Sequence, residues 1–336
     1  MLKPDDRSAR QDTSRDVTTL GRDGPLVSRI GLGLAAIGRP AYITTNRAAE
    51  LGSDRSVGTL RELTWQLLDA AHVAGVRYID VARSYGSAEA FLSGWLASRG
   101  GAGDVVVGSK WGYTYVGGWD MAAPVQEVKD LTLATFERQY AETRALLGDY
   151  LRLYQVHSLT IESGAMEDLP LLTALARRRR KGLQLGITTT GPRQADTIGR
   201  ALEVRVDGLQ LFSSVQATWN LLEPSAGPAL GEAAAAGWAV IVKEAVANGR
   251  LTPVGDAGGD DTPLGSAAAA AGATPDALAI AAALAQPWVS VALSGAAGID
   301  QLRSNLRALD VDAVDIPDIA EPAKEYWAAR SARPWT

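Results

Sequence analysis

The feature that most constrains the fold is a regular alternation between short apolar runs and longer segments with helical spacing of apolar residues. Alternating strands and helices form a parallel sheet, which is either open and doubly wound or closed into a barrel. Strands are expected at 29–33, 76–80, 105–110, 152–157, 183–187, 208–216, 239–242 and 289–293. Helices are expected at 60–74, 88–99, 131–147, 168–181, 191–202, 230–236 and 275–285.

Eight strands, several of which end in polar residues, favour the closed α/β form, a (β/α)8 TIM barrel with its site at the carboxyl ends of the strands. An open sheet would concentrate its site at one switch point. Residues 17–27, with Gly24-Pro25 as a turn, predict a β-hairpin outside the repeat that closes the bottom of the barrel. Gly31 and Gly33 begin a dinucleotide-binding glycine pattern, but its third glycine is missing and Pro40 follows closely, so a Rossmann fold is disfavoured.

Length and composition limit the domain organisation. The chain has 336 residues, a length that barrels reach as one unit, so residues 18–336 are expected to form a single domain. Residues 1–17 are rich in Asp, Arg and Ser and are expected to be a disordered lead-in. The amino terminus lacks the apolar stretch of a signal peptide, and no apolar run is long enough to span a bilayer, so no membrane partner and a cytoplasmic location are expected.

Charge and residue content exclude several kinds of chemistry. A net charge of −5 does not favour binding to nucleic acid. The chain has no cysteine and only two histidines, so neither a thiol nucleophile nor a histidine-based metal centre is expected. His72, at the end of a predicted helix, is interpreted as a surface or capping residue.

Polar side chains end three of the predicted strands. Asp80, Lys110 and His157 stand where an apolar strand would not ordinarily carry them, and Tyr85 follows Asp80 by five residues. An acid, a base, an imidazole and a phenol at neighbouring strand ends indicate one shared site at the carboxyl ends of the strands.

The segments around these four residues resemble the signature regions of the aldo-keto reductases. They are Tyr78-Ile-Asp80-Val-Ala-Arg-Ser-Tyr85-Gly86, Ser109-Lys110-Trp111 and Gln155-Val-His157-Ser158. Further matches in family order extend the resemblance over residues 18–310. It implies a (β/α)8 barrel that transfers hydride between a nicotinamide cofactor and a carbonyl or alcohol, with Asp80, Tyr85, Lys110 and His157 as the catalytic residues.

The residue types suit the reaction that the resemblance implies. Reduction of a carbonyl needs a proton donor, and a phenol with a pKa of about 10 is a weak acid unless its anion is stabilised. We expect Lys110 to lower the pKa of Tyr85, Asp80 to hold Lys110, and a neutral His157 to donate a hydrogen bond to the carbonyl oxygen.

The resemblance also implies the cofactor contacts. They are Thr188, Thr189, Gln216, Lys243, Glu244, Gly249, Leu251, Gly295, Ala297, Gln301 and Asn305. Members that prefer NADPH often carry Lys or Arg where this chain has Gly295 and Gln301. NADPH is expected on family habit, with NADH as the alternative, and no metal is expected.

Aromatic residues predict the substrate pocket. Trp111, Tyr113, Trp119 and Trp219 are expected to line it, and they favour an apolar or ring-bearing carbonyl compound, such as a secondary-metabolite intermediate. The long segment 248–272 is expected to be a mobile loop covering the cofactor. Two alternatives stay open: a nucleotide-binding regulatory subunit, and a tailoring enzyme with chemistry beyond simple reduction. The sequence specifies neither the substrate, nor the direction of the reaction, nor the oligomeric state.

Overall fold

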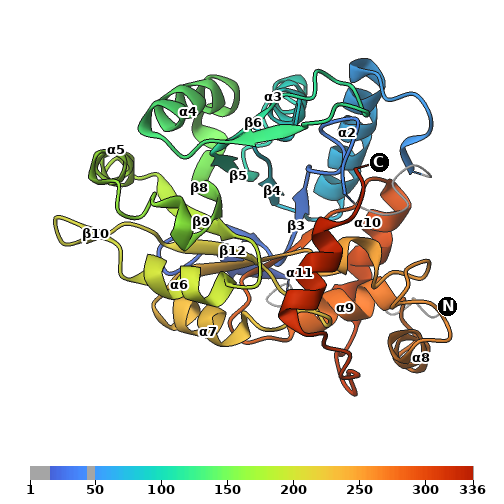
Figure 1. The fold of residues 1–336 in the computed structure, drawn as a ribbon. Helices are drawn as coiled ribbons and strands as arrows, with labels where there is room; N and C mark the ends of the chain where they lie inside the picture. The colour runs from blue at the N-terminus through green and yellow to red at the C-terminus, as the bar shows by residue number, and fades with distance from the viewer. Residues whose placement is uncertain (1–15, 44–49, 336) are drawn as a thin grey trace, which may run out of the picture.

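A closed barrel of eight parallel strands forms the centre of the molecule (Figure 1). The structure is a computed structural model and describes residues 16–43 and 50–335. The barrel strands are β3 (Ile30–Gly33), β4 (Tyr78–Asp80), β5 (Val106–Trp111), β8 (Leu151–Leu159), β9 (Gln184–Thr189), β12 (Ser214–Thr218), β13 (Ala239–Lys243) and β14 (Val291–Ser294). The pairing of β14 with β3 closes the barrel. The predicted TIM barrel is confirmed, and the open sheet is not formed.

Helices surround the barrel and bury side chains against it (Figure 1). They are α2 (Val57–Val73), α3 (Ala88–Ser98), α4 (Leu133–Leu147), α5 (Leu169–Arg179), α6 (Gln194–Leu202), α7 (Gly227–Ala235), α9 (Pro275–Leu284) and α10 (Ile299–Leu306). Several begin at side-chain caps that satisfy a free backbone amide. Ser56 accepts from the Thr59 amide, Thr132 from Thr135 and Asp168 from Leu171.

The amino-terminal hairpin closes the bottom of the barrel, as expected. Its strands β1 (Val17–Thr19) and β2 (Leu26–Ser28) pair antiparallel. Leu20, at the turn, is fully buried in a cluster with barrel residues such as Tyr78 and Ile241. The side chain of Gln184 donates to the Leu20 carbonyl over 3.1 Å, which fixes the hairpin to β9. Of the predicted disordered lead-in, residues 1–15 lie outside the described residues, and Val17 already belongs to β1.

Several short elements lie between or beyond the barrel units. They are β6 (Tyr113–Tyr115), β7 (Glu127–Lys129), β10 (Arg205–Val206), β11 (Leu209–Gln210), α8 (Pro263–Ala270), α11 (Ala323–Ser331) and the 3-10 turns η1 (Gly148–Tyr150), η2 (Ile161–Ser163), η3 (Ala247–Gly249) and η4 (Arg307–Asp310). The run predicted as one strand at 208–216 is divided between β11 and β12. The expected loop at 248–272 contains α8, because Thr262 caps it, Pro263 begins it and an alanine run has high helix propensity.

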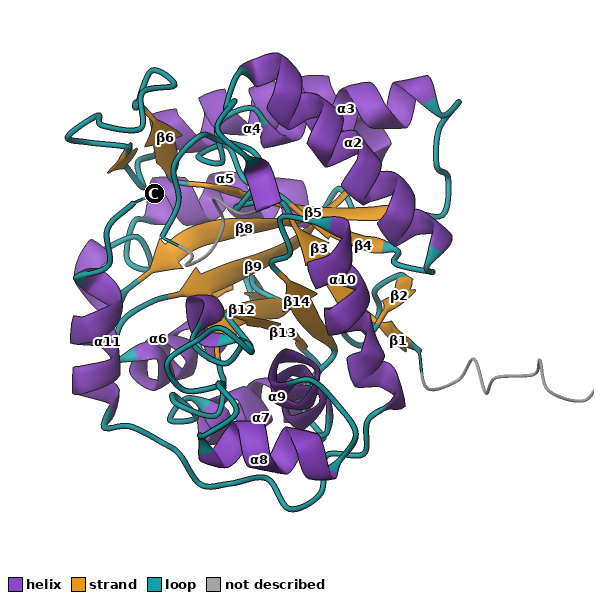
Figure 2. Cartoon of the chain, turned by 90° about the vertical axis from the view of Figure 1, so that its right-hand side faces the viewer, coloured by secondary structure: helices purple, strands orange, loops and turns teal. Residues whose placement is uncertain are grey.

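The carboxyl ends of the strands form the functional rim. In Figure 2 the arrows of β8 and β9 point toward the side on which α11 and the carboxyl terminus lie.

Among the described residues, no single helix is both long and apolar enough to cross a membrane. Only α8 and α9 taken together have the necessary length and apolar character, and the pair is bent by 84°.

Candidate active site

A buried ion pair links two barrel strands at this rim. Asp80 is the last residue of β4, and Lys110 lies in the neighbouring strand β5. The Lys110 Nζ lies 2.5 Å from Asp80 Oδ2 and donates a second hydrogen bond to the Val81 carbonyl over 3.1 Å. Both side chains are almost completely buried. A pair removed from water in this way holds its geometry strongly, because breaking it would leave a buried charge unpaired.

Tyr85 lies beside this pair. Its ring centroid is 5.0 Å from the Lys110 Nζ, and its side chain is buried. Burial raises the pKa of Tyr85 well above its usual value, and the Asp80 charge raises it further. The net shift is therefore opposite to the lowering expected from Lys110, because burial and the Asp80 charge dominate it. Tyr85 keeps its proton at neutral pH and is available as a donor.

His157 faces the same space from β8. Its ring packs edge-on against Tyr85 with centroids 5.7 Å apart, and against Tyr113 at 5.0 Å. Burial lowers the pKa of His157 well below its usual value, and the charges of Lys110 and Lys243 lower it further. The imidazole is therefore neutral at physiological pH and can donate one hydrogen bond. The structure thus brings the four predicted catalytic side chains to one place.

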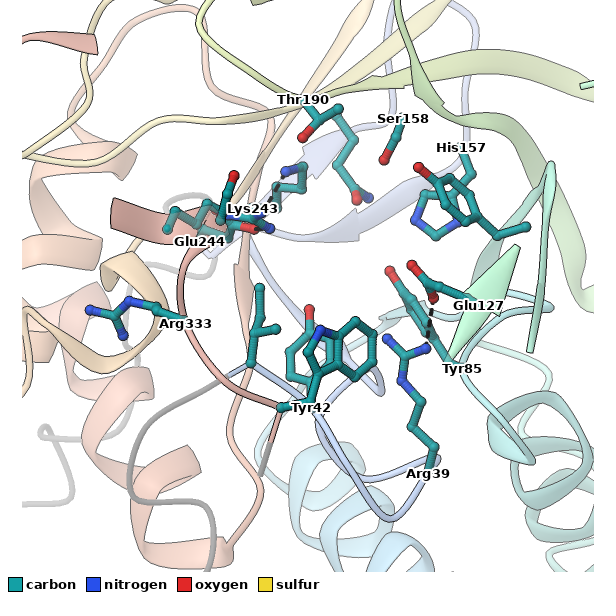
Figure 3. A pocket seen from close by; sticks show the side chains of 16 residues that line it. Arg39, Tyr42, Tyr85, Glu127, His157, Ser158, Thr190, Lys243, Glu244 and Arg333 are labelled. Atoms are coloured by element: carbon teal, nitrogen blue, oxygen red, sulfur yellow. Dashed lines mark hydrogen bonds and ion pairs between the residues drawn. The ribbon is translucent and has the colours of Figure 1, made fainter. Parts of the chain in front are cut away.

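Two cavities meet at these residues, and Figure 3 shows the larger one. The larger, here called the chamber, has a volume of about 300 Å³ and is lined by residues that include Tyr85, Tyr113 and His157. The smaller, here called the groove, has a volume of about 100 Å³. The groove is lined by Gly33, Ala35, Ala36, Asp80, Ala245, Val246, Asn248, Leu293, Ser294 and Gly295. Both cavities are also lined by Tyr42, Tyr85, Gln216, Lys243 and Glu244.

The groove combines polar groups beside the catalytic pair with a wall of small side chains. At the inner end, Gln216 donates to Asp80 Oδ1 over 2.8 Å, so its amide lies beside the catalytic pair. Along the wall the side chains are small, and a Cβ added at Gly295 would meet no atom within 4 Å. An extended planar ligand can therefore lie close to the backbone there. Gln216 and Gly295 are the predicted cofactor residues that line the groove together with Lys243 and Glu244.

Other predicted cofactor residues have structural partners. Thr188 Oγ1 accepts from the Ser158 amide over 2.7 Å, and Thr189 donates to the Gln194 side chain over 3.1 Å. The neighbouring Thr190, which sequence reasoning missed, lines the chamber instead.

The predicted cofactor residues in and just before α10 also form hydrogen bonds with protein partners. Gln301 accepts from the Ala297 amide over 2.9 Å, and the two ends of the Asn305 amide bind Ser294 and Asp276 at 2.7 Å each. Gly249 and Leu251 are buried at and beside η3, and neither lines the chamber or the groove.

A second charged group lies where the chamber and the groove meet. Lys243 donates to Thr218 Oγ1 over 2.8 Å, and its Nζ is 3.6 Å from the Glu244 carboxylate. Arg330 of α11 binds the same carboxylate with two hydrogen bonds of 2.9 and 2.5 Å. Burial lowers the pKa of Lys243 to about 8. The charges of Lys243 and Arg330 outweigh burial at Glu244 and lower its pKa to about 2. The carboxyl-terminal helix is thereby fastened over the rim.

The walls of the chamber differ from the predicted aromatic pocket. Only Tyr113 of the four predicted residues lines it. Trp111 is fully buried against Phe136, Trp219 packs against Trp288, and Trp119 donates to the Arg55 carbonyl. These three indoles stabilise loops and the barrel wall, because large apolar rings gain most from burial.

Charged residues that the sequence did not single out line the chamber instead. They are Arg39, Glu127, Arg330 and Arg333, together with the rings of Tyr42 and Trp335. In Figure 3 the dashed line joins Arg39 to Glu127, which lie 2.7 Å apart. Arg39 follows β3 in the chain, so its position after a predicted strand could have identified it from the sequence as a candidate site residue. The tail residues carried no such signal, apart from the aromatic Trp335.

Among the described residues, no group of three or more His, Cys, Asp or Glu side chains could hold a metal ion.

The comparisons with known proteins agree with this geometry. The model of the Aldo/keto reductase family matches residues 29–324. An aryl-alcohol dehydrogenase [NADP(+)] from Phanerodontia chrysosporium is 27% identical over 215 residues, which are 61% of this chain and 53% of the relative. The chain thus spans about half the length of that curated relative.

Solved structures extend the likeness over most of the chain. A putative aldo-keto reductase from Pseudomonas aeruginosa has a TM-score of 0.62 and 25% identity, and the match covers 87% of this chain and 94% of that one. An aldo-keto reductase from Bacillus halodurans, in its holo form, has a TM-score of 0.63 at 21% identity over 94% and 96% of the two chains, and it supports the fold alone. With the family model covering the barrel, this chain belongs to the aldo/keto reductase family.

Proposed function

We propose that the protein is an NAD(P)H-dependent oxidoreductase that reduces an aldehyde or ketone to an alcohol. The observation that carries the proposal is the placement of a protonated, buried Tyr85 between the Lys110–Asp80 pair and a neutral His157. A carbonyl oxygen held between the phenol and the imidazole would have two hydrogen-bond donors as negative charge develops on it.

Each residue has a distinct task in this mechanism. Tyr85 donates the proton to the carbonyl oxygen. Lys110 stabilises the phenolate that remains, and Asp80 fixes the ammonium in place. His157 orients the carbonyl through a hydrogen bond. The nicotinamide cofactor, when bound, supplies the hydride. Gln216, Lys243, Glu244 and the backbone at Gly295 are proposed to hold it in the groove.

For the cofactor we propose NADPH, with NADH as the alternative. The support for NADPH is the NADP(+) in the name of the Phanerodontia chrysosporium relative. The position of Glu50 opposes NADPH, because its carboxylate lies against Gly298, the residue that caps α10. A Cβ added at Gly298 would be only 1.8 Å from Glu50 Oε2. A carboxylate at this helix start disfavours an additional phosphate there, because like charges repel. Both cofactors therefore belong in the assay.

For the substrate we propose a carbonyl compound that carries an anionic group, rather than a purely apolar one. The chamber is lined by four cationic side chains, Arg39, Lys243, Arg330 and Arg333, and by two carboxylates, Glu127 and Glu244. Both carboxylates already bind cations. Among the described residues, Arg333 makes no ion pair, and its side chain donates a long hydrogen bond of 3.5 Å to the Asn248 carbonyl. A bound anion would offset this surplus of positive charge.

Steady-state oxidation of NADPH and of NADH with matched aldehydes tests these proposals. A suitable pair is 4-carboxybenzaldehyde and the methyl ester of the same acid, since they differ mainly in charge. We expect turnover of both and a kcat/KM about tenfold higher for the carboxylate, as a charge-assisted contact would give. Equal values would contradict the anionic substrate alone. No turnover of any carbonyl with either cofactor would contradict the reductase.

A further inference from the structure

A buried carboxylate outside the cavities connects the two segments that carry Tyr85 and Lys110. Glu89 lies in the first turn of α3, and its side chain is 1% exposed. Its Oε2 binds Arg83 Nη1 at 2.7 Å. Its Oε1 accepts from Ser109 Oγ over 2.6 Å and from Thr143 Oγ1 over 2.9 Å. Both oxygens are therefore used, and the charge is compensated although it is buried.

The partners of Glu89 are neighbours of the catalytic residues in the chain. Arg83 lies in the loop between Asp80 and Tyr85, and its backbone amide donates to the Lys110 carbonyl over 3.3 Å. Ser109 directly precedes Lys110 in β5. One carboxylate thus contacts the loop that positions the phenol and the strand that positions the ammonium, while Thr143 anchors it to α4.

The backbone around Tyr85 makes the loop dependent on such an anchor. The Tyr85 amide donates to the Ala82 carbonyl, and the Tyr85 carbonyl accepts from the Ala88 amide, each over 3.1 Å. The segment is therefore a tight turn that ends at the start of α3. Because Glu89 is in the first turn of that helix, a shift of its carboxylate would move the turn relative to β5. Displacements of about 1 Å are sufficient to reduce catalysis about a hundredfold.

We propose that Glu89 is a positioning residue that sets the distance between Tyr85 and Lys110 through Arg83 and Ser109, a role that rests on the proposed carbonyl reduction. Glu89 touches neither cavity, so it acts only through these partners. A purely structural ion pair would contribute to stability and leave the chemical step unchanged.

Substitution of each carboxylate that binds Arg83, Glu89 or Glu142, distinguishes a positioning role from a purely structural one. Glu142 also binds Arg83, at 3.0 Å, but its side chain is 36% exposed. Glu89→Gln removes the buried charge at nearly constant volume and places an amide donor against either Arg83 or the two hydroxyls. We expect E89Q to lower kcat for carbonyl reduction about 10- to 100-fold, with KM and the Kd for NADPH or NADH within about twofold of wild type. The matched control E142Q should keep kcat within about twofold.

Cofactor affinity is measured by quenching of protein fluorescence, and kcat at a temperature well below the melting transition of each variant. If E89Q does not fold, Ser109→Ala removes one hydrogen bond and leaves the ion pair intact, and a several-fold loss of kcat is expected. Wild-type kcat in a folded E89Q, or in S109A when E89Q is unfolded, would overturn the positioning role while leaving the reductase in place. A wild-type enzyme that reduces no carbonyl would overturn both.

Discussion

At the scale of single residues, burial decides the protonation states in the site. Tyr85 has a cationic neighbour, yet its pKa rises, because the phenol is buried and Asp80 already binds the Lys110 ammonium. His157 has cations around it, and its pKa falls. Both groups therefore carry a proton to donate without carrying a charge, which is the state that carbonyl reduction requires.

The neutral state of His157 has a consequence for the pH dependence of activity. An ordinary histidine gains a proton as the pH falls through about 6.5, but burial lowers the pKa of His157 and keeps it neutral there. We expect kcat/KM for a neutral aldehyde to lack an inflection near pH 6.5.

The measurement is a pH profile of the wild type and of His72→Gln, which removes the only other histidine. His72 is partly exposed and pairs with Asp104, in agreement with its interpretation as a surface residue. An inflection near pH 6.5 that persists in H72Q would contradict a neutral His157.

At the scale of elements, the two ends of the barrel are closed by different parts of the chain. The hairpin β1–β2 covers the bottom with apolar contacts, whereas α11 covers the rim with two buried aromatic rings, Tyr326 and Trp327, and with ion pairs. Tyr326 of α11 accepts a hydrogen bond from Asn220 over 3.0 Å, and Glu321, just before it, binds Arg250 at 2.7 Å. Burial of these two rings and the largely buried Glu244–Arg330 pair therefore both hold α11 over the rim.

The hairpin offers a matched pair of leucines for measuring its contribution. Leu20 is fully buried, whereas Leu26 in the same hairpin is 67% exposed. Leu20→Ala is expected to lower the free energy of unfolding by about 3 kcal/mol, because it leaves a cavity at the bottom of the barrel. Leu26→Ala is expected to change it by less than about 0.5 kcal/mol. Urea unfolding measures both, and equal effects would mean that the hairpin does not seal the core.

At the scale of the whole molecule, the sequence predicted the barrel because strand and helix periods differ and alternate along the chain. It predicted the catalytic side chains because residues such as Asp80 and Lys110 interrupt apolar strands. It did not predict the walls of the chamber, since Arg330 and Arg333 reach the rim only through the path of the carboxyl-terminal segment. The tryptophans were misleading for a related reason: aromatic content does not distinguish a ligand wall from core packing, as buried Trp111 illustrates. Glu89 is likewise visible only when α3, α4 and β5 come together.

The proposed mechanism requires Tyr85 as the proton donor for a reduction whose hydride comes from the cofactor. The most direct measurement compares wild type with Tyr85→Phe, using a cofactor deuterated at the transferable position of the nicotinamide and an aldehyde that the wild type reduces. Wild type should give an alcohol with deuterium on the former carbonyl carbon. Y85F should bind the cofactor with a similar Kd but form that product at least about a hundredfold more slowly. Undiminished formation of labelled alcohol by Y85F, or unlabelled alcohol from wild type, would contradict the account.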